Sequence, residues 1–138
     1  MPVIRRADIG DLDAVAAIQA SSPQAAHWRV DEYMQYEFSV AIEEGKIAGF
    51  LVWRDLADGE CEVLNLAVAP EFRRRGIGRG LIERLTTGSC RQIFLEVRES
   101  NQAARFFYKS MGFQEVNTRQ KYYDSPLESA IVMKFHSC

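Results

Sequence analysis

The order of hydrophobic and polar positions predicts short strands and helices alternating along the whole chain. Alternating or continuous apolar runs typical of strands occur at residues 2–6, 39–43, 46–53, 61–68, 92–97, 113–121 and 130–135. Apolar residues at helical spacing predict helices that begin near residues 9, 30, 77 and 101. Glu44-Gly45 and Asp58-Gly59 are typical hairpin turns, so the strands on either side of each turn are expected to be antiparallel.

The strand at residues 61–68 is expected to be central. It is apolar on both faces apart from Glu62 and Asn65, which predicts helices on both sides of it, and it ends before Pro70. The pattern as a whole predicts an α/β fold with a mixed, mostly antiparallel sheet of six to seven strands, flanked by about four helices. Residues Tyr122 to Ser129 (YYDSPLES) are expected to form a loop between the last two strands.

A glycine-rich basic turn follows the central strand. Gly76 and Gly78 allow the backbone to bend around a ligand, and the first amides of the next helix have no partner within that helix. Arginines surround these glycines, at Arg73, Arg74, Arg75 and Arg79. Amides, helix dipole and arginines together favour a pyrophosphate, although the arginines could equally be a solvated helix entrance.

Two known phosphate loops differ from this turn. The Walker loop needs Lys-Ser/Thr after its last glycine, which this chain lacks. The dinucleotide loop needs glycine where this chain has Leu81, although Glu96 does stand twenty residues after Gly76, at the place of a ribose-binding acid. Dinucleotide binding is therefore the second interpretation of the turn.

Composition narrows the class of protein. The 138 residues, 47% hydrophobic and 26% charged, predict one globular domain over residues 1–138. No run is long enough to cross a membrane and no signal peptide is evident, so the expected location is the cytoplasm. The net charge of −2 argues against nucleic acid or a membrane surface as partner.

The cysteines and histidines do not predict a metal site. Cys61, Cys90 and Cys138 are odd in number and lack metal-ligand spacing, and His27 and His136 lie far from most of them. We therefore expect no metal and no disulfide, with Cys61 a small core residue and Cys138 a free tail residue.

Two longer segments carry a resemblance to a known family. VLNLAVAPEFRRRGIGRGL and IFLEVRESNQAARFFYKSMGF, in this order, resemble the acyl-coenzyme A signature of the GNAT superfamily of N-acetyltransferases. Arg73, Gly76 and Gly78 match the family's glycine turn. LEVRESN, FYKSMGF, KYY and Trp28 are similar to bacterial ribosomal-protein-alanine N-terminal acetyltransferases. The chain differs from those enzymes at His27, Arg29 and Ser129, on the substrate side.

The resemblance implies a site for acetyl-coenzyme A. In the family, two splayed strands hold the thioester arm, which implies a role here for the backbone of Leu66, Ala67 and Val68. It also implies that the turn holds the pyrophosphate through Arg73, Arg74, Arg75, Gly76, Ile77, Gly78 and Arg79. Asn101 would contact the pantetheine arm, although its position is equally that of a helix cap.

The resemblance further implies the catalytic groups. Glu96 matches the family's general base and Tyr108 its general acid, while Glu62 is a second candidate base or an acceptor-binding residue. Trp28, Tyr122 and Tyr123 would bind the acceptor, and Glu128 could attract its ammonium group.

The expected acceptor is a protein N-terminus. An α-amino group, with a pKa of about 8, is roughly one-tenth neutral at pH 7, far more than a lysine side chain. A small-molecule amine acetyltransferase and a non-catalytic acyl-coenzyme A sensor are the alternatives, and the sequence leaves the oligomeric state open.

Overall fold

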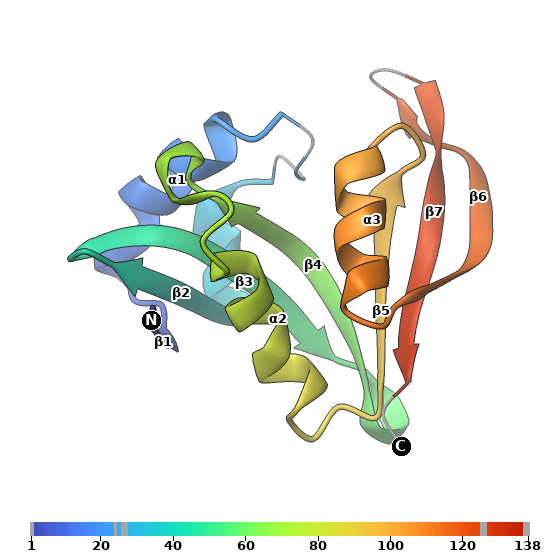
Figure 1. The fold of residues 1–138 in the computed structure, drawn as a ribbon, viewed down its shortest axis with the longest axis horizontal. Helices are drawn as coiled ribbons and strands as arrows, with labels where there is room; N and C mark the ends of the chain where they lie inside the picture. Colours follow the sequence, from blue (N-terminus) through green and yellow to red (C-terminus); the bar gives the residue numbers. More distant parts are fainter. Residues whose placement is uncertain (1, 24, 26–27, 125–126, 137–138) are drawn as a thin grey trace.

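The computed structural model describes residues 2–23, 25, 28–124 and 127–136, and in this part of the chain one sheet has helices on both faces (Figure 1). The sheet has seven strands in the order β1-β2-β3-β4-β5-β7-β6. All neighbouring strands are antiparallel except β4 and β5, which are parallel. The predicted α/β class and the mostly antiparallel sheet are confirmed.

The strands are β1 (Val3–Arg6), β2 (Glu37–Glu43), β3 (Lys46–Asp55), β4 (Glu60–Val68), β5 (Gln92–Arg98), β6 (Gln114–Asp124) and β7 (Leu127–His136). The α-helices are α1 (Leu12–Ala20), α2 (Ile77–Thr86) and α3 (Gln102–Ser110). Short 3₁₀ helices are η1 (Ile9–Asp11), η2 (Val30–Gln35), η3 (Ala57–Gly59) and η4 (Pro70–Phe72). Among the described residues, no helix is both long and apolar enough to cross a membrane.

Turn chemistry fixes the first hairpin and the start of α1. Glu44 and Gly45 both have positive φ, of 53° and 75°, as the tight turn between β2 and β3 requires. Asp8 and Asp11 form a capping box before α1, and Arg5 donates two hydrogen bonds to the Asp11 carboxylate. The guanidinium of Arg5 lowers the pKa of Asp11.

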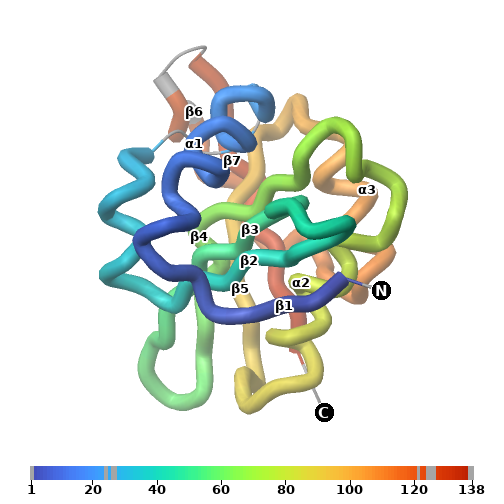
Figure 2. The backbone as a smooth tube through the Cα atoms, turned by 90° about the vertical axis from the view of Figure 1, so that its left-hand side faces the viewer, coloured from blue at the N-terminus to red at the C-terminus, as the bar shows by residue number. Residues whose placement is uncertain are grey.

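Helices α1 and α2 lie on opposite faces of β2–β4, as Figures 1 and 2 show from two directions. On one face Phe50 packs against the buried ring of Tyr33 in η2. On the other face Gly49 allows α2 to approach, because a Cβ there would lie 3.0 Å from Ile77. Adjacent residues of β3 therefore contact different layers, as a strand's alternation requires.

The prediction of a helix that begins near residue 30 is only partly right. The segment forms the 3₁₀ helix η2, which ends at Gln35. Glu37 and Phe38 instead pair with Trp53 and Val52 in the sheet, so strand pairing takes the residues that a longer helix would need.

The predicted loop at residues 122–129 is wrong for most of its length. Tyr122 and Tyr123 belong to β6, and Glu128 belongs to β7, where it pairs with Tyr123. Cross-strand pairing extends the hairpin so far that only residues 125–126 separate the two strands, and these lie outside the described residues.

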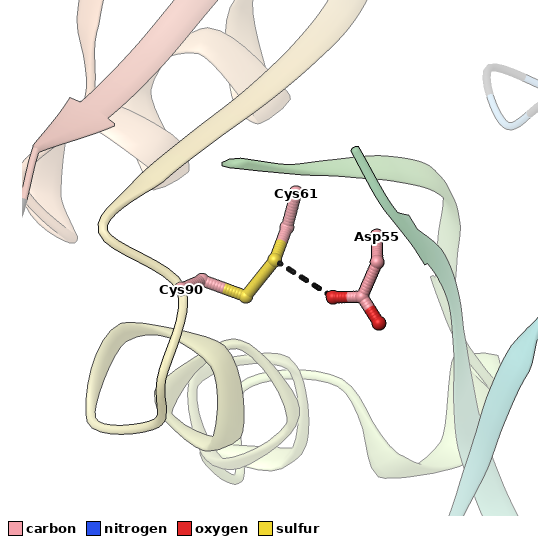
Figure 3. A group of neighbouring side chains, drawn as sticks. All are labelled: Asp55, Cys61 and Cys90. Carbon is pink, nitrogen blue, oxygen red and sulfur yellow. Dashed lines mark hydrogen bonds between the residues drawn. A yellow bond between two sulfur atoms is a disulfide. The ribbon is translucent and has the colours of Figure 1, made fainter. Parts of the chain in front are cut away.

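The prediction of no disulfide is also wrong, because Cys61 is bonded to Cys90 (Figure 3). The Cα atoms are 5.9 Å apart, and the parallel register that sets Cys61 of β4 opposite Ile93 brings Cys90 beside it. A carboxylate oxygen of Asp55 lies 3.6 Å from the Cys61 sulfur. Sulfurs bonded to each other offer no thiolate to a metal. Cys138 lies outside the described residues.

Candidate active site

A cleft of about 910 Å³ lies where β4 and β5 diverge. The two strands pair only from Glu60 to Glu62 on β4 and from Gln92 to Phe94 on β5. Beyond this vertex they separate (Figure 1), and both strands line the cleft. Burial along β4 alternates between buried and half-buried residues. Helices α1 and α2 both contact this strand, as predicted, and the cleft borders β4 where β5 no longer pairs with it.

The cleft brings together many of the residues that the sequence singled out. They come from six separate segments: Trp28, Glu62, Leu66, Ala67, Val68, Arg73, Glu96, Asn101, Tyr108, Tyr122 and Tyr123. His27 lies outside the described residues.

The remaining predicted residues form the turn before α2. Gly76, the N-cap of α2, has a left-handed conformation with φ of 81°, and Arg74 before it has φ of 64°. Ile77 is buried in the core, and a Cβ on Gly78 would be 3.4 Å from the ring of Phe107. Arg79 is exposed. The turn therefore leaves the start of a ten-residue helix without a side-chain cap, as an anion site for its first amides requires.

Two of the turn's arginines already have partners. Arg75 forms an ion pair with Glu44 and lies over the ring of Phe72. Arg73 donates a 3.3 Å hydrogen bond to the Val68 carbonyl, which joins the turn to the end of β4.

A β-bulge shapes β4 beside the cleft. Val52 and Trp53 are consecutive on β3 but pair with Asn65 and Val63, so Leu64 is an extra residue on β4. Leu64 lines the cleft. The amide of Leu66 donates to the side chain of Asn65, so a cofactor arm that used this amide would have to replace that bond. Sequence patterns gave no signal for the bulge.

Glu96 lies on β5 with its side chain only 19% exposed. Its Oε1 accepts a 2.6 Å hydrogen bond from Arg119. Its Oε2 is buried, with no hydrogen-bond partner among the described residues. A buried carboxylate oxygen without a donor is costly and suggests a donor that arrives with a ligand.

Tyr108 reaches the cleft from α3 and is 6% exposed. Its ring packs edge to face against Phe107 and Phe113. Burial raises the pKa of Tyr108, so its phenol keeps its proton at any ordinary working pH.

The other two acidic candidates differ in position. Glu62 lines the cleft and is paired with Arg54. Glu128 accepts hydrogen bonds from the Ser100 amide and from Arg98, and the Ser100 amide in particular lowers its pKa. These bonds tie β7 to the end of β5, which is a structural use of Glu128 that the sequence did not predict.

Asn101 is the N-cap of α3, because its Oδ1 accepts a 3.1 Å hydrogen bond from the Ala104 amide. Since Asn101 also lines the cleft, the capping interpretation and the ligand-binding one are compatible.

A buried polar network supports the wall that carries Trp28. Asn65 of β4 donates to both Gln19 of α1 and the Tyr33 hydroxyl, which itself donates to Gln19. Gln19 in turn donates a 2.7 Å hydrogen bond to the Trp28 carbonyl. The network therefore links the acceptor side of the cleft to the strand expected to hold the cofactor. Gln19 was missed because a single glutamine in a helix carries no pattern.

Two stacked pairs form the opposite wall. The guanidinium carbons of Arg119 and Arg98 lie 4.2 and 4.3 Å from the ring centres of Tyr122 and Tyr123, respectively. Burial raises the pKa of Tyr123 to about 12, so this phenol remains a hydrogen-bond donor at neutral pH.

The splayed strands, the bulge and the glycine turn define a class of protein. The family model described as the acetyltransferase (GNAT) domain matches residues 34–115, more than half of the chain. The chain therefore belongs to the GNAT family and is an acetyl-coenzyme A-dependent N-acetyltransferase. The dinucleotide interpretation of the glycine turn is wrong.

Individual relatives show which members of this family the chain resembles. The chain is 35% identical over 109 residues to the [ribosomal protein bS18]-alanine N-acetyltransferase of Escherichia coli K12, a match that covers 75% of this chain and 71% of the relative. The crystal structure of the Escherichia coli ribosomal-protein-S18-alanine N-acetyltransferase has a TM-score of 0.84 and 30% identity, covering 100% of this chain and 96% of that one. Naa20 of Chaetomium thermophilum, solved with a bisubstrate analogue, has a TM-score of 0.87 and 27% identity, covering 98% and 86%.

Proposed function

We propose that this acetyltransferase modifies the α-amino group of a protein or peptide whose first residue is small. The observation that carries the proposal is the buried, unpartnered Oε2 of Glu96, found among the described residues in a cleft walled by Trp28, Tyr122 and Tyr123. A primary amine is a donor that can satisfy such an oxygen, and aromatic walls suit an extended peptide. The similarity to N-terminal alanine acetyltransferases supports the same acceptor class.

The residues of the cleft fit acetyl-coenzyme A. Leu66 to Val68 present a strand edge that β5 does not pair with, to which the thioester arm can bind through main-chain groups. The turn before α2 offers backbone amides for the pyrophosphate, beside Arg73, Arg74, Arg75 and Arg79. Asn101 contributes its side-chain amide to the pantetheine arm. Acetyl-coenzyme A supplies an acetyl group activated as a thioester.

The chain's own residues manage the protons of the reaction. Glu96 accepts a proton from the acceptor amine, which must be neutral to attack. Tyr108 holds a proton at a phenol that burial keeps un-ionised, and it can donate that proton to the thiolate as the thiolate leaves. Glu62, which is paired with Arg54, borders the cleft, and its carboxylate attracts the ammonium group before deprotonation.

The glycine turn provides a direct test of the cofactor site. We expect Gly76→Val to weaken acetyl-coenzyme A binding by at least about 2 kcal/mol, or about 30-fold, through lost charge-assisted amide contacts. A β-branched residue resists the left-handed φ of 81°, so the amides that follow must move. Calorimetric titration measures the effect.

Gly45→Val is the matched control. Gly45 has φ of 75°, and, as at Gly76, a Cβ there would meet no atom within 4 Å, but it lies in the β2–β3 turn. The control therefore carries a similar backbone strain outside the turn before α2, to which the neighbouring Glu44 is linked by its ion pair with Arg75. Unchanged affinity of folded Gly76→Val would contradict the assignment, as would tight binding of NADH.

The acceptor is tested with short peptides. We expect peptides that begin with alanine or serine to be acetylated, and mass spectrometry to place the group on the α-nitrogen. The same peptides with a blocked amino group should not react even when they contain lysine. Tyr123→Ala should raise the peptide KM several-fold, roughly the effect of one lost hydrogen bond and ring contact, without a change in acetyl-coenzyme A affinity.

Other outcomes identify a different acceptor. Acetylation of lysine side chains alone would contradict the N-terminal proposal. Turnover with a free polyamine or amino acid, but with no peptide, would make the enzyme a small-molecule acetyltransferase and would direct attention to Arg29 and Ser129.

A further inference from the structure

The two oxygens of the Glu96 carboxylate have different surroundings. Oε1 is held at 2.6 Å by Nη1 of Arg119, which comes from β6. Oε2 is buried and has no hydrogen-bond partner in the described part of the chain, and the residue lines the cleft. One oxygen is thus occupied by the protein, and the other is left for a substrate.

We propose that Arg119 is a positioning residue for acetyl transfer, which holds Oε1 of Glu96 so that Oε2 meets the acceptor amine. The inference rests on the proposed role of Glu96 as the base. Arg119 acts through Glu96 and is not assigned any contact with the reacting atoms. A carboxylate anchored at one oxygen cannot rotate freely about its terminal bond, so the second oxygen keeps a fixed direction.

Arg119 is itself restrained, which a positioning residue must be. Its guanidinium carbon lies 4.2 Å from the ring centre of Tyr122, although its side chain is half exposed. The register of β6 against β7 is irregular between Arg119 and Tyr123, so the strand bends at this point. The ring stack and the bond to Glu96 together define one orientation of the guanidinium.

Among the charged and titratable groups around Glu96 in the described part of the chain, Arg119 is the cation that forms a hydrogen bond with its carboxylate. On β7 the residue opposite Glu96 is Val132, which is apolar. The other groups are Glu62 of β4, Arg98 of β5, Tyr108 of α3, and Tyr122 and Tyr123 of β6. Glu62 is bonded to Arg54, and Arg98 to Glu128. The hydrogen bond and charge of Glu96 raise the pKa of Arg119 most, and the negative charge of Glu62 adds a smaller contribution.

The test compares Arg119→Met with Arg119→Lys in the full-length enzyme. Its readout is kcat and the peptide KM, determined separately for an alanine-initiated peptide at saturating acetyl-coenzyme A. Without its anchor the Glu96 carboxylate can rotate, so Arg119→Met should lower kcat about 10-fold, the size expected for imperfect placement of a general base. The peptide KM should change little, because Arg119 is not assigned any contact with the peptide. Arg119→Lys should restore part of kcat.

Two controls separate positioning from general damage. Arg105→Gln removes another arginine–carboxylate pair, between Arg105 of α3 and Glu115 of β6. Neither residue lines the cleft, so this variant should leave kcat and the peptide KM unchanged. In a Glu96→Gln background, Arg119→Met should have no further effect, because coupled residues are not additive.

The possible results of these experiments separate the role of Arg119 from the proposed role of Glu96 as the base. A slow Glu96→Gln together with a wild-type kcat for Arg119→Met overturns the role of Arg119 alone. Full activity of Glu96→Gln overturns the base and the inference that rests on it. A change confined to the peptide KM, with kcat unchanged, would make Arg119 a contact for the peptide and contradict positioning.

Discussion

Glu96→Gln is expected to lower kcat/KM by about 100-fold or more at neutral pH, the effect of removing a general base. The amide keeps the size of the side chain but cannot take a proton from the amine. The loss should be largest at low pH, where the acceptor is protonated, and smaller above the α-amine pKa of about 8. Steady-state rates of coenzyme A release measured across pH check this expectation.

Two further variants, Glu62→Gln and Tyr108→Phe, show whether the effect of Glu96→Gln is that of losing the base. Glu62→Gln, on the facing strand, should mainly raise the peptide KM, because the Glu62 carboxylate attracts the ammonium group. It should not remove the base, because Glu62 is already paired with Arg54. Tyr108→Phe should lower kcat with acetyl-coenzyme A affinity nearly unchanged, because the hydroxyl acts as the thiolate leaves. Full activity of Glu96→Gln, with loss of activity in Glu62→Gln, would transfer the role of base to the central strand.

Reduction of the Cys61–Cys90 disulfide is expected to lower the free energy of unfolding by about 3–4 kcal/mol, the loop-closure value for a separation of 29 residues. The closed loop, residues 61–90, contains all of β4 after Glu60, the glycine turn and α2, so the bond restrains the unfolded chain across these elements. Denaturant unfolding with and without a phosphine reductant measures the change.

Cys90→Ala provides the control for the reductant. The variant cannot form the bond, so its unfolding should be insensitive to the reductant and should match that of the reduced wild type apart from the cost of a small buried cavity. Identical unfolding of oxidised and reduced wild type would contradict a stabilising role. Saturating acetyl-coenzyme A should stabilise both forms, since a ligand that binds only the folded state always does so.

Local patterns in the sequence were enough for most of the fold. The spacing of apolar residues identified the strands and the three α-helices, because burial of one face imposes a period of 2 or 3.6 on the chain. Glu44-Gly45 fixed a hairpin, and Gly76 marked the turn before α2, because such turns depend on few residues. The cofactor class followed from the resemblance of two segments, in order, to a known family, and the family match confirmed it.

Tertiary structure alone decided the features that depend on register between distant segments. Cys61 meets Cys90 because β4 and β5 are parallel at their vertex, and no spacing rule contains that pairing. Arg119 meets Glu96 across β7, because the sheet order places β5 next to β7 and then β6. Contacts of this kind carry no periodic signal, since their partners are brought together by the topology of the sheet and not by neighbouring residues.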